Sequence, residues 1–319
     1  MKKSAVFLAA DSGGSKTLWT LVTAEGEQVF ACRTEGLGAI REGLLPVQET
    51  VEKAAEAIKP YGTPQGIHLS LGGPNTQEVF SALARVWNDV PIQVEREACG
   101  DSILYAAGFL DCSAVVMCGT GSTAVGNTKK GRCYAGGWGP VYGDGGSGGG
   151  LGCDALRLFL RSVDGLADIG AVASLFAAQT DGLDVREFKD RMELKRRALQ
   201  MTRRELAALA PSLYALSVQG DITAQMLYRQ AAVQVAEMAY SVSDNDANAN
   251  VLLCGGFFAE KPAFVEACRE EFAKKSRAKL HYHPTFSPIV GVQLTVLKTH
   301  SITITPAIAG RLFDNQTRH

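Results

Sequence analysis

Residues 11–17 read DSGGSKT and stand between two segments, residues 4–10 and 17–23, that we predict to be β-strands. Adjacent glycines let a backbone turn tightly and let a ligand approach it closely. Successive N–H groups in such a turn form a concave site for an anion such as phosphate. A carboxylate at a strand end, here Asp11, can hold Mg2+ through water. An ordinary hairpin turn would explain the same residues, so the stretch needs support from elsewhere in the chain.

That support comes from a repeat of the same pattern. Residues 118–123 read CGTGST and again follow an apolar segment, residues 113–118. Around each glycine turn the residues predict the order β-β-β-α-β-α-β-α, with a helical insertion after the third strand of the second half. The predicted strands are 4–10, 17–23, 28–33, 67–71, 92–94, 113–118, 123–127, 132–135, 251–254 and 280–283. The predicted helices are 46–58, 76–87, 97–109, 151–163, 169–178, 185–197, 202–217, 222–243, 262–274 and 288–298.

These elements predict an α/β protein with two similar domains. A three-stranded meander followed by alternating helices and strands gives a mixed sheet covered by helices. We expect an N-terminal domain at 1–111 and a C-terminal domain at 112–319, with the helical insertion at about 151–245. The last helix could return to the N-terminal domain. Two such domains leave a cleft between them, which is a usual place for a ligand.

A third stretch, residues 136–150, reads GGWGPVYGDGGSGGG. Flexible linkers are also rich in glycine. We disfavour a linker because large side chains such as Trp138 interrupt the run and a predicted helix follows at once. The N-terminus of that helix, beside Asp144 and Ser147, suits a substrate or a phosphate group.

A fourth stretch, residues 252–258, reads LLCGGFF. A strand that ends in two glycines, Gly255 and Gly256, lets a flat ring lie against the backbone. A simple turn from strand to helix would give the same residues.

The bulk composition excludes several classes of protein. The 319 residues, at ~100–200 per domain, fit two domains. The net charge is −1 with no block of like charges, so a nucleic-acid partner is not expected. No apolar run approaches the ~18 residues that a membrane span needs. The eight cysteines form no CxxC pair, which argues against zinc or iron–sulfur binding and for buried thiols in a reducing cytoplasm.

Taken in this order, the four stretches resemble the motifs of the actin-like ATPase superfamily, which contains sugar kinases, heat-shock 70 chaperones and actin. Within it, the chain resembles the N-acetylglucosamine kinases and the BadF/BadG/BcrA/BcrD-type ATPases. Residues 119–122 match the family's GTGS motif, and residues 136–147 resemble its GGWG…GDEGS loop. The resemblance spans essentially the whole chain. It implies a duplicated ribonuclease H-like fold with ATP between the domains, and ATP- and Mg2+-dependent phosphorylation of a hydroxyl on a small molecule such as a sugar or N-acetylglucosamine.

The resemblance also assigns roles to individual residues. Asp11 would hold the metal ion. The nucleotide would be bound by the glycine turns, that is by Gly13, Gly14, Ser15, Lys16, Thr17, Gly119, Thr120, Gly121, Ser122, Gly255 and Gly256. The acceptor would contact Gly137, Trp138, Gly139 and Asp144.

Two residues compete for the role of general base, which accepts the proton of the acceptor hydroxyl. Kinases of this type carry an aspartate at the start of the helix that precedes the second half. Glu97 has the matching neighbour, Ala98, whereas Asp101 has the matching distance to Gly119. The spacing favours Asp101, and the residue pattern favours Glu97.

Two departures from the family pattern leave the acceptor open. No asparagine follows the third strand, where Arg41 could instead bind a charged acceptor, and glycine replaces the glutamate of GDEGS. Two other functions remain as alternatives: an ATPase that energises a redox partner, and a non-catalytic nucleotide sensor. We expect a cytoplasmic homodimer without a nucleic-acid or membrane partner.

Overall fold

The computed structural model describes residues 5–13, 16–38, 44–73, 75–96, 100–284 and 286–315. The chain divides into two units. Unit 1 comprises Met1–Val115 and His283–His319, and unit 2 comprises Val116–Tyr282. Unit 1 is therefore assembled from two separate parts of the sequence, and each unit is described by itself below.

Unit 1 is built on one mixed sheet of five strands, β1 (Val6–Ser12), β2 (Lys16–Thr23), β3 (Gln28–Glu35), β4 (Ile67–Leu71) and β5 (Ile92–Arg96). Their order in the sheet is β3-β2-β1-β4-β5. β1 pairs antiparallel with β2, to which a tight turn joins it, and parallel with β4. The register places Asp11, near the end of β1, opposite Leu18 of β2 and Ser70 of β4. The glycine turn thus leaves the central strand of the sheet.

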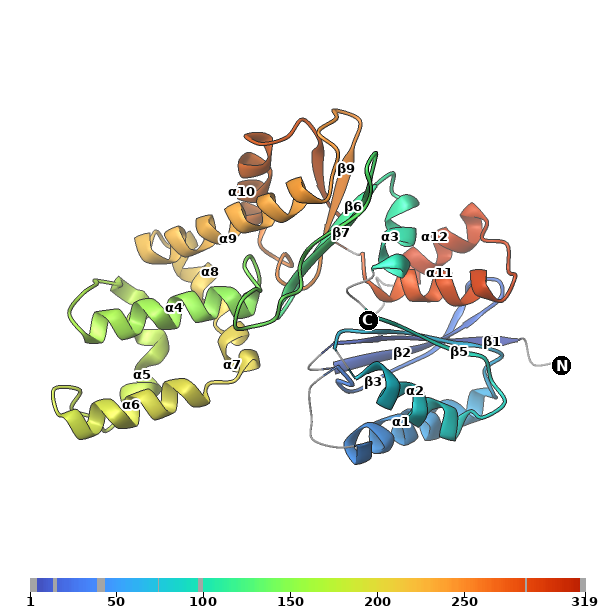
Figure 1. Cartoon of the computed structure of the whole chain (residues 1–319), viewed down its shortest axis with the longest axis horizontal. Helices are drawn as coiled ribbons and strands as arrows, with labels where there is room; N and C mark the ends of the chain where they lie inside the picture. Colours follow the sequence, from blue (N-terminus) through green and yellow to red (C-terminus); the bar gives the residue numbers. More distant parts are fainter. Residues whose placement is uncertain are drawn as a thin grey trace. The chain divides into compact units, whose positions relative to one another are not determined.

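Helices cover both faces of this sheet. α1 (Leu44–Ile58) and α2 (Thr76–Val86) lie on one face, and α3 (Asp101–Gly108) and α11 (Ile289–Thr299) lie on the other, with α12 (Pro306–Asp314) against α11 (Figure 1). α1 points Val47, Val51, Ala54 and Ile58 into the core, at the spacing of one helix face.

The C-terminal part of unit 1 is joined to its sheet by a buried polar contact. Gln293 of α11 has no exposed surface. Its Nε2 donates to Thr20 Oγ1 and to Gln28 Oε1, both at 3.0 Å. Because buried amides need hydrogen-bond partners, this contact fixes α11 in position over β2.

Unit 2 repeats the sheet of unit 1. Its strands are β6 (Ala114–Cys118), β7 (Ser122–Thr128), β8 (Gly131–Gly136), β9 (Asn250–Cys254) and β10 (Lys279–Tyr282), in the order β10-β9-β6-β7-β8. β7 and β8 are antiparallel, and β9 and β10 are parallel. Each strand has the same neighbours as its counterpart in unit 1, so the predicted duplicated α/β fold with mixed sheets is confirmed.

Unit 2 also contains a helical insertion between β8 and β9. It comprises α4 (Gly148–Val163), a 3-10 helix (Gly170–Phe176), α5 (Ala177–Thr180), α6 (Phe188–Gln200), α7 (Arg203–Ala208), α8 (Ala210–Val218) and α9 (Ile222–Ser241). α10 (Pro262–Ala273) follows β9 and packs against α9, which also contacts β7 and β8.

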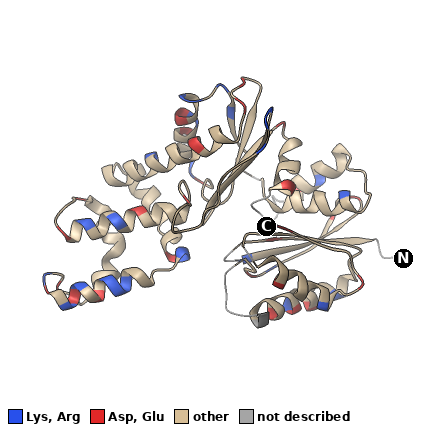
Figure 2. Ribbon diagram, viewed as in Figure 1, with Lys and Arg blue, Asp and Glu red and all other residues tan. Residues whose placement is uncertain are grey.

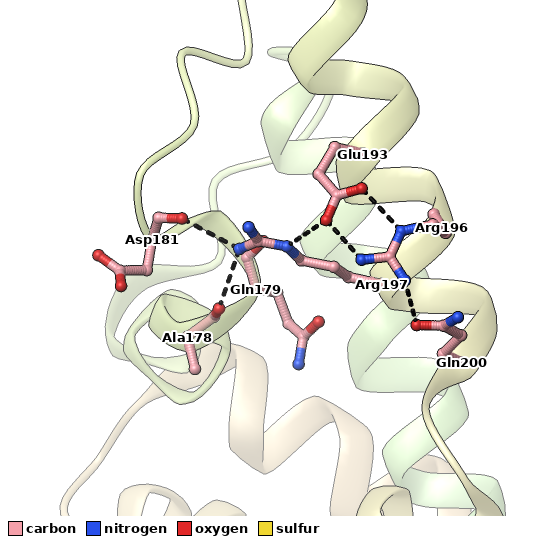
Figure 3. Close-up of polar contacts among 7 residues, drawn as sticks. All are labelled: Ala178, Gln179, Asp181, Glu193, Arg196, Arg197 and Gln200. Carbon is pink, nitrogen blue, oxygen red and sulfur yellow. Dashed lines mark hydrogen bonds and ion pairs between the residues drawn. The ribbon is translucent and has the colours of Figure 1, made fainter.

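Basic and acidic residues are interspersed along α6 (Figure 2). Arg197 of this helix closes the end of α5: its Nη1 donates to the carbonyl oxygens of Gln179 at 3.2 Å and Asp181 at 3.0 Å, and its Nε donates to Glu193 at 3.0 Å (Figure 3). A cation is favourable at a helix C-terminus, where carbonyl groups lack partners. This network fixes the outer part of the insertion.

Several elements differ from the sequence prediction; the predicted helix 202–217, for example, is divided into α7 and α8. α4 begins at Gly148, three residues earlier than predicted, because Ser147 caps its first turn by accepting a hydrogen bond from the Gly150 N–H. α12 was not predicted, although Thr305 caps it and Pro306 follows. None of the helices in the described ranges combines the length and apolar character needed to cross a bilayer.

Candidate functional site

The hydroxyl groups that flank the first glycine turn are used inside unit 1. The Oγ of Ser12 lies 2.7 Å from the Oγ1 of Thr17, and both residues are buried. Thr17 donates to the carbonyl oxygen of Glu35 at 2.9 Å, and the N–H of Leu37 donates to Ser12 Oγ at 2.9 Å. Thr17 therefore joins β2 to the segment after β3, and these contacts give no support to its predicted role in binding the nucleotide.

The other residues of this turn are compatible with the prediction that it binds phosphate. Lys16 is exposed, and its carbonyl oxygen accepts from the N–H of Gly13 at 3.0 Å. A Cβ placed on Gly13 would meet no heavy atom of the described residues within 4 Å, so another group could approach its backbone. Gly14 and Ser15, like Arg41, lie outside the described residues.

Asp11 carries a carboxylate that the protein makes costly to ionise. Burial raises its pKa to about 6, and the positive charge of Lys16 opposes this rise. A bound cation would favour the ionised form. Mg2+ usually binds through one or two carboxylates and completes its shell with waters and substrate phosphates. Asp11 fits this role, and no group of three or more His, Cys, Asp and Glu side chains suited to a metal ion occurs in the described part of the chain.

The two candidates for the general base follow β5 in the sequence. Asp101 is exposed and is the first residue of α3, after Gly100 in the left-handed region with φ 61°. An acidic side chain at this end of a helix is stabilised by the helix dipole. Glu97 lies outside the described residues. The choice between the two remains a prediction.

A buried polar cluster beside these candidates was not found from the sequence. His68 Nε2 lies 2.9 Å from Glu95 Oε2, and the Ser102 hydroxyl donates to the same carboxylate oxygen. The N–H of Ser102 also donates to Glu95 Oε1 at 3.1 Å. Burial alone would raise the pKa of Glu95, but the hydrogen bonds from His68 and Ser102 hold it below its usual value. The cluster connects β4, the end of β5 and the first turn of α3.

In unit 2 the GTGS turn is interlocked with the loop that precedes α4. Gly119 donates its N–H to Gly121 O at 2.8 Å and closes the turn between β6 and β7. The Ser122 hydroxyl donates to Gly145 O at 2.7 Å, and the Ser122 N–H donates to Asp144 Oδ1 at 3.3 Å. The side chain of Ser122 thus holds the two loops together, so it supports the phosphate motif from within the protein.

The N-terminus of α4 completes this interlocked structure. Its first donors, the N–H groups of Gly148 and Gly149, bind the carbonyl oxygens of Gly119 at 2.9 Å and Thr120 at 3.0 Å. Helix N-termini are favourable anion sites when these donors are free. Here they are engaged by the GTGS turn, which corrects the expectation that this terminus binds a phosphate or substrate directly.

Asp144 lies at the centre of the interlocked loops. Its side chain is 4% exposed, and its backbone adopts φ 65° in the left-handed region, which is uncommon outside glycine. It forms an ion pair with Arg203, the first residue of α7. Strained backbone at a buried carboxylate is typical of functional sites. Sequence analysis found Asp144 but missed Arg203, because no local pattern shows that α7 returns to this loop.

The remaining predicted acceptor residues form an open loop. Trp138 is 79% exposed, and Gly137 and Gly139 have positive φ angles of 72° and 83°. The Gly137 N–H donates to Ser122 O at 2.9 Å, so the loop starts beside the GTGS turn. The exposed indole leaves an aromatic surface that an acceptor could use.

The two glycines after β9 differ in their surroundings. Gly255 has φ 106°, and a Cβ there would collide with the carbonyl of Cys118, which also accepts from the Phe257 N–H at 3.0 Å. A Cβ on Gly256 would meet no described heavy atom within 4 Å. Gly255 is thus required by the fold, whereas Gly256 leaves its face open, as a site for a flat ring would need.

Known proteins resemble the chain in sequence. N-acetyl-D-glucosamine kinase of Dictyostelium discoideum is 23% identical over 324 residues, which cover 92% of this chain and 98% of that protein. N-acetylmuramic acid/N-acetylglucosamine kinase of Clostridium acetobutylicum is 31% identical over 119 residues, which cover 37% of this chain and 38% of that protein.

Solved structures share the fold. A Chromobacterium violaceum protein assigned as an N-acetylglucosamine kinase superposes with a TM-score of 0.69 at 21% identity and covers 92% of this chain and 99% of its own. The ROK hexokinase of Thermus thermophilus gives 0.56 at 16% identity, with 93% and 100% covered. Both support the actin-like ATPase fold. Residues 10–295 match the sequence model of the BadF/BadG/BcrA/BcrD ATPase family, so the chain belongs to that family.

Proposed function

We propose that this protein is a kinase that uses ATP and Mg2+ to phosphorylate a hydroxyl group of a sugar or an amino sugar such as N-acetylglucosamine. The observation that carries the proposal is the interlocking of the GTGS turn with the loop that buries Asp144. It places a carboxylate, which can accept a hydrogen bond from a sugar hydroxyl, next to a glycine turn with the character of a phosphate site. Family membership supports the use of ATP, and the kinase from Dictyostelium discoideum supports a sugar acceptor.

The proposed roles follow the contacts. In unit 2, Gly119, Thr120 and Gly121 bind phosphate, Gly256 lies against the nucleoside, and Asp144 and Trp138 contact the acceptor. In unit 1, Gly13 and Lys16 bind phosphate and Asp11 holds Mg2+. When bound, Mg2+ would neutralise negative charge on the phosphate groups.

The chemical step is the transfer of the γ-phosphoryl group from ATP to the acceptor oxygen, whose proton passes to a base while ADP leaves. Asp101 or Glu97 is that base. Positioning and preorganised donors supply most of the catalysis in such transfers. We infer that the buried Glu95–His68–Ser102 contacts serve this purpose, because they fix the first turn of α3, where Asp101 lies.

Cytoplasmic location and a homodimeric state are part of the proposal. The seven cysteines of the described ranges are free thiols, which suits a reducing compartment. Burial raises the pKa of the Cys118 thiol, next to Cys254 and Cys268, well above its usual value, so this group favours the inert neutral form.

A panel of sugars and polyols with labelled ATP and Mg2+ tests the function. We expect labelled sugar phosphate from N-acetylglucosamine or a related amino sugar, and none when EDTA replaces Mg2+. Hydrolysis of ATP at the same rate with and without every acceptor would instead favour an ATPase that energises a partner. Iron measured after anaerobic purification would identify that partner system as a redox one.

A further inference from the structure

Arg203 enters the proposed phosphate turn from the helical insertion. Its guanidinium lies where a Cβ on Gly121 would be, so any side chain at position 121 would collide with it and with Asp144 Oδ1. The Nη2 atom forms the ion pair with Asp144. Gly121 therefore makes room for Arg203 as well as for a ligand.

The glycine run at the start of α4 explains how Arg203 reaches this position. α4 and α7 pack closely: a Cβ on Gly152 would collide with Leu206 O, and a Cβ on Gly149 would lie 3.4 Å from Arg203 Cγ. Thr202 and Glu205 form a capping box that fixes the first turn of α7. The backbone that carries Arg203 is thus positioned on both sides, and only the side chain has freedom to move.

The ion pair leaves donors of Arg203 unused. Asp144 Oδ2 is paired with Arg203 Nη2, whereas Arg203 Nε is buried and has no hydrogen-bond partner among the described residues. The Arg203 side chain is still 39% exposed. A guanidinium carries five donors in a planar fork that matches carboxylate and phosphate groups. The donors that Asp144 does not use remain suited to a further anion.

We propose that Arg203 binds the polyphosphate of the nucleotide at the Gly119–Gly121 turn and that phosphate and Asp144 compete for its guanidinium. This inference rests on the proposed kinase function. When Arg203 turns to phosphate, the Asp144 carboxylate is released to accept a hydrogen bond from the acceptor hydroxyl. Nucleotide binding thereby prepares the acceptor site, and the coupling between the two ligands passes through one side chain.

Isothermal titration of the whole protein with Mg-AMP-PNP, Mg-ADP and AMP tests the proposal. Arg203→Gln should weaken AMP-PNP and ADP roughly tenfold or more, because a charge-assisted contact to phosphate is lost. AMP, which lacks the polyphosphate, should change little. Arg204→Gln is the matched control, since it removes the same charge from the next, exposed residue of α7.

A second variant gives a change of opposite sign. Asp144→Asn removes the competing carboxylate, so AMP-PNP should bind several-fold more tightly, a gain that damage to the fold would not produce. In the Arg203→Gln background, Asp144→Asn should change the affinity for AMP-PNP little. This comparison separates competition for Arg203 from direct repulsion between Asp144 and phosphate.

The outcomes are distinct. If the wild type binds nucleotide and Arg203→Gln binds it with the same dissociation constants, the role of Arg203 is overturned and the kinase proposal still stands. An equal gain from Asp144→Asn in both backgrounds would overturn the competition. Absence of binding by the wild type to all three nucleotides would overturn both this inference and the proposed function.

Discussion

The Nε2 atom of His68 on β4 lies 2.9 Å from the Oε2 atom of Glu95 on β5, within unit 1. Both side chains are nearly inaccessible to solvent, at 1% and 8% exposure. Ser102 adds two hydrogen bonds to the same carboxylate. One ionised carboxylate therefore joins two strands to the first turn of α3. Its removal should lower the stability of the protein as well as its catalytic rate.

Glu95→Gln is expected to lower the free energy of unfolding at pH 7 by about 2 kcal/mol, since buried hydrogen bonds to a charged group contribute on this scale. The pKa of Glu95 is lower in the folded protein than in the unfolded chain. Its stabilisation is therefore present above the unfolded-state pKa of about 4.3 and is lost as the pH falls through the folded-state value. Urea titrations should show that the difference in the free energy of unfolding between the wild type and Glu95→Gln is smaller at low pH than at pH 7. Glu25→Gln, in an exposed turn, is the control and should change little at either pH.

Asp11→Asn should stabilise the protein when EDTA is present. The folded-state pKa of about 6 lies above the usual value of 3.8, so ionised Asp11 costs stability increasingly from pH 4 to 6 and fully above pH 6. At pH 8 the variant should gain up to about 3 kcal/mol, and at pH 3 nothing. Chemical unfolding at both pH values measures this, with the exposed Asp89→Asn as control. A loss of stability at pH 8 would contradict the raised pKa. The same variant should lose Mg2+-dependent phosphoryl transfer.

Gly255 and Gly256 offer a matched pair of substitutions. Gly255→Ala should destabilise the protein by at least about 2 kcal/mol, because of its positive φ and the collision with the Cys118 carbonyl. Gly256→Ala should change stability by less than about 0.5 kcal/mol, because its Cβ meets no described atom.

The effect of ATP on stability tests the proposed role of Gly256 in nucleotide binding. ATP with Mg2+ at 100 times its Kd should add about 2.7 kcal/mol to the wild type. Gly256→Ala should lose part of this gain, since the added methyl group would meet the nucleoside. Thermal melting with and without millimolar ATP measures the gain. A wild-type melting temperature that does not respond to ATP would count against nucleotide binding altogether.

Asp101→Asn should reduce phosphoryl transfer by about 10²–10⁴-fold and leave nucleotide affinity unchanged, because the amide keeps the shape but cannot accept the proton. Glu97→Gln should be milder. Steady-state transfer rates, with ATP affinity measured in parallel, decide between them. An inactive Glu97→Gln with an active Asp101→Asn would reverse the assignment, and normal turnover by both would remove these residues from the mechanism.

The sequence predicted the sheets well because strand periodicity and glycine turns are local signals. The turns at Gly13 and Gly119 were placed correctly between their strands. What local patterns could not predict were contacts between residues far apart in the chain. The Glu95 cluster joins three elements, and Arg203 reaches Asp144 from another helix. For the same reason Ser122 and Thr17 were assigned to nucleotide binding, although the fold engages their hydroxyl groups.

The buried contact of Gln293 with Thr20 and Gln28 has a consequence for synthesis on the ribosome. The strands of unit 1 emerge first, but α11, which covers one face of their sheet, emerges only after all of unit 2. The sheet of unit 2 needs no later residues and can form while the chain is still growing. The nascent chain must therefore carry in unit 1 a sheet face that lacks α11 through the translation of Val116–Tyr282, and apolar surface left exposed in this way favours aggregation during that interval.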